Sequence, residues 1–184
     1  YGIKTGNTDT VRPVKQRKHT TMDLFMGTNV FIDDHLDNIL AVGNVREYQN
    51  WRWSCGNPLM FPNNKYAFSP SAAAGGNSWF FDDYYYRLNN AGLFTMTCIQ
   101  GGVNMEELGG IRGDGKPILK TEDPASPLSY IRHADAFYQF AARYGSRTVP
   151  DNTLKLLSNQ PRVSGLNRVQ AIEVWNEQNA TWAG

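Results

Sequence analysis

Short apolar runs along this chain alternate with segments whose apolar residues recur at helical spacing. The apolar runs predict four strands, at about residues 23–31, 44–48, 93–100 and 171–175. The segments between them predict three helices, at about residues 34–42, 78–90 and 127–144. A glycine, which favours the end of a helix, follows each of these segments: Gly43, Gly92 and Gly145. The third helix has the clearest pattern, carried by Ile131, Ala134, Phe137, Ala141 and Tyr144.

The alternation of strands and helices predicts an α/β fold with a parallel sheet and right-handed crossovers. Two long loops, at about residues 49–77 and 101–126, both follow strands. In a barrel such loops lie on the carboxyl face, where active sites are found. We therefore expect a partial (β/α)8 TIM barrel containing about the first four βα units. Residues 1–20 are polar and basic and are expected to form an arm, and residues 21–184 the N-terminal half of the barrel domain.

Length and charge narrow the functional classes. The chain has 184 residues, whereas a complete barrel needs roughly 250. Basic and acidic side chains number 18 and 17, so nucleic acid is not an expected partner. No stretch approaches the ~18 apolar residues of a membrane span. No signal peptide is visible, but the chain begins at Tyr1 and ends without a helix after the fourth strand, so we expect both ends to be truncated.

The two cysteines, Cys55 and Cys98, have neither metal-ligand spacing nor a CxxC pattern. Cys98 lies in an apolar run and is expected to be a buried free thiol, with a Cys55–Cys98 disulfide as the alternative. No pair of histidines has metal-ligand spacing either. We therefore expect no metal and no cofactor.

The strongest candidate for chemistry is the segment Ile172-Glu173-Val174-Trp175-Asn176-Glu177-Gln178-Asn179. Side chains on a strand alternate, so Glu173, Trp175 and Glu177 are expected on one face, with Asn176 beside them. Glu177 is expected at the mouth of the barrel, where burial disfavours the charged carboxylate and raises its pKa. That environment suits a proton donor near neutral pH. The alternative is an ordinary loop glutamate after an edge strand.

This segment resembles the Trp-Asn-Glu-Pro signature of clan A glycoside hydrolases, most of all the β-xylosidase and α-iduronidase family, with cellulase-like relatives next. The resemblance implies that Glu177 is the general acid/base at the end of strand four and that Asn176 binds the sugar 2-hydroxyl. Gln178 departs from the signature, which has proline there; that proline shapes the loop and has no chemical role. The resemblance also implies a carbohydrate substrate and an extracellular or periplasmic location.

The same clan commonly has an arginine on strand two that holds the nucleophilic carboxylate, and Arg46 is the matching residue. A surface arginine and an ion-pair partner of Glu173 are the alternatives. Aromatic side chains make up 12% of the chain, and those outside the predicted core suit stacking on sugar rings. The candidates are Trp51, Trp53, Phe61, Tyr66 and Trp79 in or beside the first long loop, together with Trp175. The alternative is that half of the loop aromatics pack the loops together.

Retaining hydrolysis needs two carboxyl groups roughly 5–5.5 Å apart. In clan A the nucleophile follows strand seven, which lies beyond the four strands predicted here. We therefore expect a retaining glycosidase whose nucleophile is missing from this chain, so that the chain itself is inactive. Two alternatives stay open: a non-catalytic carbohydrate-binding protein that uses aromatic loops, and another barrel enzyme such as a lyase or aldolase. Open edges on strands one and four predict self-association.

Overall fold

The computed structural model describes residues 21–50, 79–100, 117–156 and 160–176. Four parallel strands form one sheet in the order β1-β2-β3-β4. The strands are β1 (Gly27–Val30), β2 (Asn44–Asn50), β3 (Phe94–Gln100) and β4 (Ala171–Val174). The helices are α1 (Met22–Phe25), α2 (Leu36–Ile39), α4 (Phe81–Asn90) and α5 (Ile131–Tyr144), with short 3-10 helices η2 (Pro127–Tyr130) and η3 (Asp151–Thr153). The chain is therefore an α/β protein, as the alternation of elements predicted.

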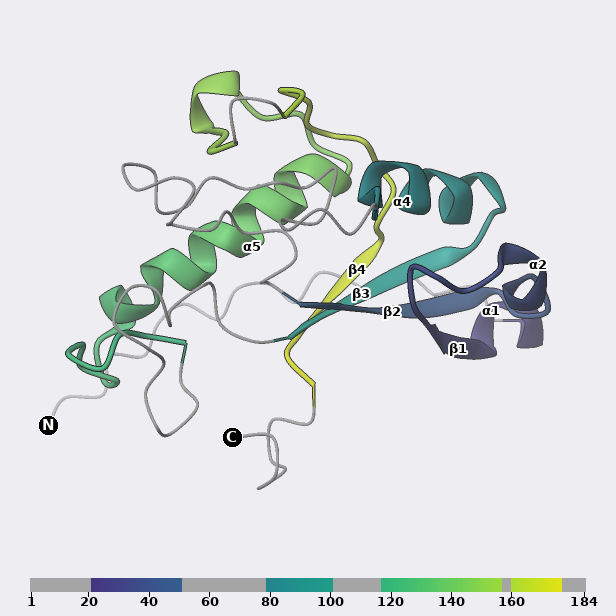
Figure 1. The fold of residues 1–184 in the computed structure, drawn as a ribbon, viewed down its shortest axis with the longest axis horizontal. Coiled ribbons are helices and arrows are strands. Elements are labelled where there is room, and N and C mark those ends of the chain that lie inside the picture. Colours follow the sequence, from purple (N-terminus) through teal and green to yellow (C-terminus); the bar gives the residue numbers. More distant parts are fainter. Residues whose placement is uncertain (1–20, 51–78, 101–116, 157–159, 177–184) are drawn as a thin grey trace, which may run out of the picture.

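The two longer helices, α4 and α5, lie on the same side of the sheet (Figure 1). Side chains of β2 alternate between the two faces, and Val45, Glu47 and Gln49 are the buried set. Tyr85 of α4 contacts both Glu47 and Gln49, so this buried set faces the helices. Arg46 and Tyr48 consequently project from the opposite face.

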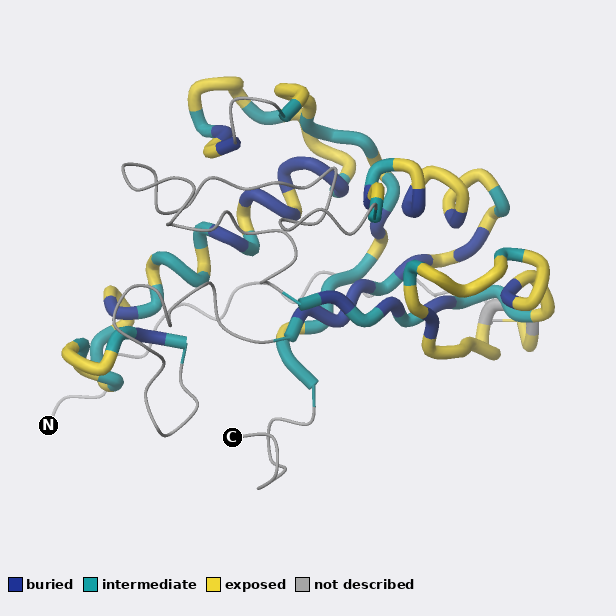
Figure 2. The backbone as a smooth tube through the Cα atoms, viewed as in Figure 1, coloured by how far each residue is buried: buried dark blue, intermediate teal, exposed yellow. Residues whose placement is uncertain are grey.

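Aromatic side chains fill the space between the sheet and the helices. Tyr85 lies edge-on to Phe140 and Tyr144 of α5, with ring centroids 6.0 and 4.6 Å away, and tilted against Tyr84 at 5.5 Å. Figure 2 shows the same pattern along the chain, because buried and exposed stretches alternate along both helices. The core therefore lies between the sheet and the helices α4 and α5. The polar side chains of the opposite face, such as Arg46, are outside this core.

An ion pair between buried Arg143 and half-buried Asp82 holds the segment that leads into β4. Arg143 of α5 is only 2% exposed and donates to both carboxylate oxygens of Asp82, at 2.9 and 2.5 Å. Its remaining Nη1 donates to the carbonyl oxygen of Pro161 at 2.9 Å, and Arg168 Nη1 donates to the carbonyl of Asp82 at 2.8 Å. Burial alone would raise the pKa of Asp82, but the hydrogen bonds and charge of Arg143 bring it below its ordinary value. This pairing connects α4, α5 and the approach to β4.

The first predicted strand is wrong in its N-terminal half. Residues 22–25 form one turn of helix, and β1 begins only at Gly27. The helix expected over residues 34–42 is also shorter, since α2 spans Leu36–Ile39, and the carboxylate of Asp34 accepts a hydrogen bond from the Phe31 amide ahead of it. Both differences arise where the apolar pattern is short and several local conformations satisfy it.

Helix α5 lies where it was predicted, but it buries a different face. Ile131 is 60% exposed, and Ala134 and Ala141 are exposed as well, whereas Gln139 and Phe140 are buried. Residues 127–130 form the 3-10 turn η2 ahead of the α-helix. The predicted helix is therefore confirmed in extent and corrected in orientation.

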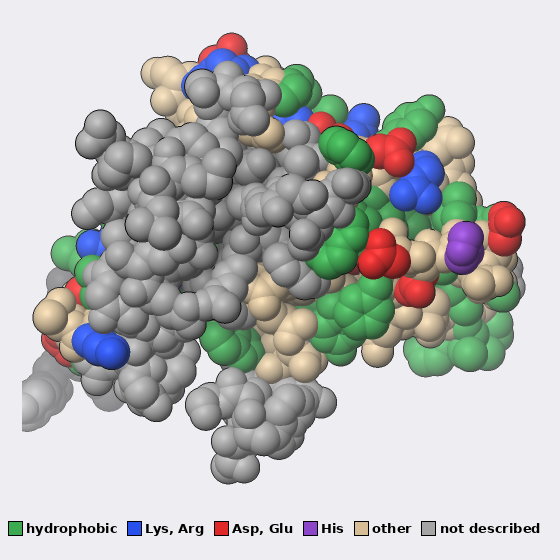
Figure 3. Space-filling view, viewed as in Figure 1, with side chains coloured by type: hydrophobic (Ala, Val, Ile, Leu, Met, Phe, Trp, Pro, Cys, Tyr) green, Lys and Arg blue, Asp and Glu red, His purple; other side chains and the backbone are tan. Residues whose placement is uncertain are grey.

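Charged side chains of both signs are interspersed over the described part of the face in Figure 3. This distribution agrees with the near balance of 18 basic and 17 acidic side chains. Among the described residues, every helix is too short or too polar to cross a membrane.

Candidate functional site

Strand β4 ends abruptly at Val174, because Trp175 adopts a left-handed backbone conformation with φ at 69°. Such a value is unusual for a large L-residue and stores backbone strain, which is found most often at functional sites. Hydrogen bonds hold the bend: the Trp175 amide donates to the carbonyl of Ile99 at 2.9 Å, and the Cys98 thiol donates to the Trp175 carbonyl at 3.8 Å. The strict alternation predicted through residue 177 therefore stops at Trp175.

The bend brings the Asn176 side chain back over the face of the sheet that lacks α4 and α5. There its Oδ1 accepts a hydrogen bond from Arg46 Nη2 at 2.9 Å. Glu173, on the same face, accepts a hydrogen bond from Arg46 Nε at 2.5 Å. Arg46 is thus the partner of Glu173, one of the two alternatives that the sequence left open, and it is also the partner of Asn176.

Arg46 gathers contacts from all four strands. Its Nη1 donates to Asn29 Oδ1 of β1 at 3.4 Å, and its Nη2 also donates to Cys98 Sγ of β3 at 3.2 Å. Its guanidinium carbon lies 4.5 Å from the ring centroid of Tyr48 on β2, within the range of a cation–π contact. Together with Glu173 and Asn176, these residues form what we call the Arg46 cluster.

The charges of the cluster are matched. The hydrogen bond and charge of Arg46 hold the pKa of the Glu173 carboxyl below its ordinary value, so Glu173 is ionised at neutral pH. Hydrogen bonding to Glu173 in turn raises the pKa of Arg46. Burial raises the pKa of the Cys98 thiol to about 11, and the nearby Arg46 opposes that rise only in part. Cys98 is a buried free thiol, as predicted, and is protonated rather than nucleophilic.

Several predicted site residues lie outside the described residues: Glu177, Trp51, Trp53, Phe61 and Tyr66. Of the other aromatic candidates, Trp79 is partly exposed just before α4. Its indole N–H donates to Oδ1 of Asp33, which follows β1, at 3.0 Å. Trp175 is half-buried at the bend that follows β4. Among the predicted polar residues the structure therefore brings Arg46 and Asn176 together, and Trp79 lies apart from both in the contacts described.

A second polar group, which the sequence analysis did not assign to any role, lies on the helix face. Glu47 is fully buried, and its Oε2 lies 2.8 Å from the Tyr85 hydroxyl, which also lies 2.6 Å from Gln49 Oε1. Burial raises the pKa of Glu47 to about 8, although the hydrogen bond with Tyr85 opposes the rise. Strand alternation was the signal for it, because Glu47 shares the buried parity of Val45.

The proton count at Tyr85 supports a protonated Glu47. One tyrosine hydroxyl carries a single proton, yet two acceptor oxygens lie within hydrogen-bond distance of it. If Glu47 is the neutral carboxylic acid, it donates its proton to the Tyr85 oxygen and Tyr85 donates to Gln49, so both short contacts are satisfied. Among the described residues, Glu47 Oε1 has no hydrogen-bond partner, which also favours the neutral form.

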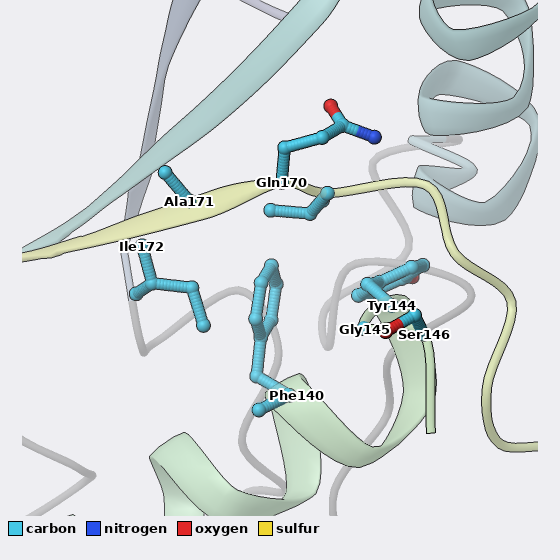
Figure 4. A pocket seen from close by; sticks show the side chains of 9 residues that line it. Phe140, Tyr144, Gly145, Ser146, Gln170, Ala171 and Ile172 are labelled. Carbon is cyan, nitrogen blue, oxygen red and sulfur yellow. The ribbon is translucent and has the colours of Figure 1, made fainter. Parts of the chain in front are cut away.

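A cavity of about 290 Å³ lies between α5 and β4 (Figure 4). The ring of Phe140 rises from α5 toward Ile172 of β4, and Tyr144 closes another side. Neighbouring strand residues face opposite ways, so Ile172 places this cavity on the face away from the Glu173 carboxylate. No acidic or basic side chain of the described residues lines it, and we interpret it as a gap in the helix–sheet packing rather than as the site of chemistry.

Among the described residues, no group of three or more histidine, cysteine, aspartate or glutamate side chains is placed to hold a metal ion. The fold and the cluster define an α/β protein with a polar centre on the sheet face opposite α4 and α5, reaching the end of β4 at Asn176. No protein-family model, curated protein or solved structure matches the chain.

Proposed function

We propose that this chain is part of a retaining glycoside hydrolase in which Glu177 is the general acid/base and Asn176 binds the sugar. The observation that carries the proposal is the contact between Arg46 of β2 and Asn176, which follows the end of β4. Glu177 is the next residue in the chain after Asn176. The motif that resembles the clan A signature therefore contributes Asn176 to the Arg46 cluster, which also contains the arginine of the second strand.

The topology supports a barrel over an open doubly wound sheet. The strand order follows the chain order without a reversal, all neighbours are parallel, and α4 and α5 cover one face. A doubly wound sheet has helices on both faces and a point where the strand order reverses. We therefore propose that the four strands are the first half of a (β/α)8 barrel, with the Arg46 cluster on its inner surface.

In the proposed reaction Glu177 protonates the glycosidic oxygen while a second carboxylate attacks the anomeric carbon, and water then releases the sugar. Glu173 is a poor second carboxylate, since its Oε2 is already held by Arg46. We propose that the nucleophile belongs to a later strand that this sequence does not include, and that the chain alone binds saccharide without cleaving it.

Saccharide binding by the chain tests the proposal. We would measure affinity for β-linked xylo-, cello- and manno-oligosaccharides by calorimetry, with Asn176→Ala and Glu177→Gln as variants. Loss of the Asn176 hydrogen bond is expected to weaken binding about tenfold, the effect of about 1–1.5 kcal/mol. Asp37→Asn, which removes an exposed carboxylate on α2, is the control and should bind as the wild type does.

Hydrolysis of an aryl glycoside is the second measurement. The proposal expects no turnover by the chain alone. Turnover that disappears in Glu177→Gln would support the assignment as a glycosidase, but it would contradict the proposal that the nucleophile is missing from this chain. Absence of binding to every saccharide, or binding that Asn176→Ala leaves unchanged, would contradict the assignment of the site; unchanged binding that depends on the aromatic residues would instead support a carbohydrate-binding protein.

A further inference from the structure

The Arg46 guanidinium has little capacity left for a ligand. It has five N–H groups, and contacts with Glu173, Asn29, Cys98 and Asn176 account for four of them. Its flat face lies against Tyr48. The side chain is 20% exposed, so it is reached from solvent only in part. Arg46 is consequently better suited to hold other side chains than to bind the saccharide itself.

The contact with Arg46 also fixes which end of the Asn176 amide faces outward. The Oδ1 atom accepts from Nη2, so the two N–H groups of Nδ2 remain available to donate. An amide that is free to flip would offer its oxygen and its nitrogen to a ligand equally. With Arg46 in place, Asn176 directs its two Nδ2 donors away from the guanidinium, and it therefore favours an acceptor oxygen such as that of a sugar hydroxyl.

Glu173 is the one charged partner of Arg46 among the described residues. Its carboxylate meets Nε, while Asn176 meets Nη2 on the adjacent side of the guanidinium, and the two residues come from the same strand and the bend that follows it. Without the charge of Glu173, the long arginine side chain regains rotamer freedom and the orientation of Nη2 is lost.

We propose that Glu173 is a positioning residue: its carboxylate fixes the Arg46 guanidinium, which fixes the Asn176 amide with its N–H groups toward the saccharide. The inference rests on the proposed function, because it names the residue behind the sugar contact of that same site. Glu173 does not touch the substrate. Its side chain is 35% exposed, so the ion pair itself contributes little to the stability of the fold.

We call the contacts from Glu173 through Arg46 to Asn176 the relay, and a double-mutant cycle on saccharide affinity tests it. We expect Glu173→Gln to weaken binding about five- to tenfold when Asn176 is present, and to have no further effect in the Asn176→Ala background. A purely structural role would instead weaken binding by the same factor in both backgrounds, and that result would overturn the proposal. Glu122→Gln is the matched control, because Glu122 forms a partly buried ion pair with Arg132 and has no contact with the Arg46 cluster among the described residues.

A spectroscopic measurement separates this inference from the proposed function. The side-chain amide resonances of Asn176 and the Nε–H resonance of Arg46 report their hydrogen bonds in the protein without ligand. We expect Glu173→Gln to shift both sets and Glu122→Gln to shift neither. If the wild type binds no saccharide but both resonances move, the function is wrong and the relay is right; if the Asn176 amide is unmoved by Glu173→Gln, the relay is wrong whatever the chain binds.

Discussion

Replacement of Glu47 by glutamine should remove a pH dependence from the stability of the protein. Glu47 is fully buried beside Tyr85, and burial raises its pKa from 4.5 to about 8. The folded state therefore holds a proton that the unfolded chain releases at neutral pH. This group stabilises the fold fully below about pH 4.5, and its contribution is lost as the pH rises toward 8.

The magnitude follows from the two pKa values. Their difference of 3.5, at about 1.36 kcal/mol for each pH unit, corresponds to roughly 5 kcal/mol between low and high pH. While one proton is released on unfolding, the free energy of unfolding falls by about 1.4 kcal/mol per pH unit. Half-buried His133 acts in the opposite sense, because burial lowers its pKa from 6.5 to about 4 and its contribution is lost as the pH falls through that range. His133 is present in both proteins, so the difference in slope between the wild type and Glu47→Gln isolates Glu47.

Urea unfolding followed by tryptophan fluorescence measures this slope. The measurements are made at about pH 6.5, 7.0, 7.5 and 8.0, which covers the range from the pKa of unfolded histidine to the pKa of folded Glu47. We expect the free energy of unfolding of the wild type to fall across the series and that of Glu47→Gln to fall much less. The glutamine also buries an amide with fewer partners, which costs about 1–3 kcal/mol at every pH and shifts the whole curve without changing its slope. Equal slopes in the two proteins would refute a buried, protonated Glu47.

Three further predictions concern packing and association. Phe140→Ala should lower the free energy of unfolding by about 3–5 kcal/mol, measured in urea, because it enlarges the cavity between α5 and β4; a change under about 1 kcal/mol would show that α5 does not pack there. Gly165→Ala should destabilise the protein by about 1–3 kcal/mol, and more than Gly92→Ala does. Both glycines have positive φ, but only at Gly165 would an added Cβ lie 2.9 Å from a backbone nitrogen, that of residue 148. Equal effects of the two substitutions on thermal unfolding would contradict this close approach. Because β4 is the last strand of the described sheet, sedimentation should show concentration-dependent self-association that Val174→Lys weakens, and a monomeric wild type at all concentrations would contradict it.

The sheet was predictable because its signals are local. Each apolar run is short, each is followed by a helix-like segment, and this alternation alone predicts parallel neighbours in chain order. The prediction failed before Gly27, where an apolar stretch of a few residues satisfies either a strand or a helical turn. The bounds of β2 were too short at its carboxyl end, where Gln49 and Asn50 continue the ladder with β3 although their side chains are polar.

The buried face of α5 depended on contacts that apolar spacing cannot reveal. Gln139 is buried because its amide donates to the carbonyl of Thr153 at 3.0 Å and accepts from the amide of Lys155 at 2.8 Å. Arg143 is buried because Asp82, 61 residues earlier in the chain, neutralises it. Polar residues that are buried through distant partners look exposed in a sequence pattern, and here they displaced the predicted face.

The resemblance to the clan A signature selected Asn176 and Arg46, and the structure brings these two residues into contact. The geometry of that contact was less predictable. The left-handed backbone of Trp175 was not predictable, because nothing in a tryptophan side chain signals a positive φ, and this bend is what turns Asn176 toward Arg46. Glu173 was placed correctly beside Arg46 as one of two alternatives, but its relation to Asn176 depends on that bend.

A crystal structure of the chain with a bound β-linked oligosaccharide would examine the proposed site without relying on any variant. We expect one sugar ring over the carboxyl ends of β2 and β4, with Asn176 Nδ2 donating to a ring hydroxyl and the Glu177 carboxyl about 2.6–3.2 Å from a glycosidic oxygen. A saccharide found only on other surfaces, with Glu177 directed away from the Arg46 cluster, would show that this sheet does not form the sugar-cleaving centre proposed for it.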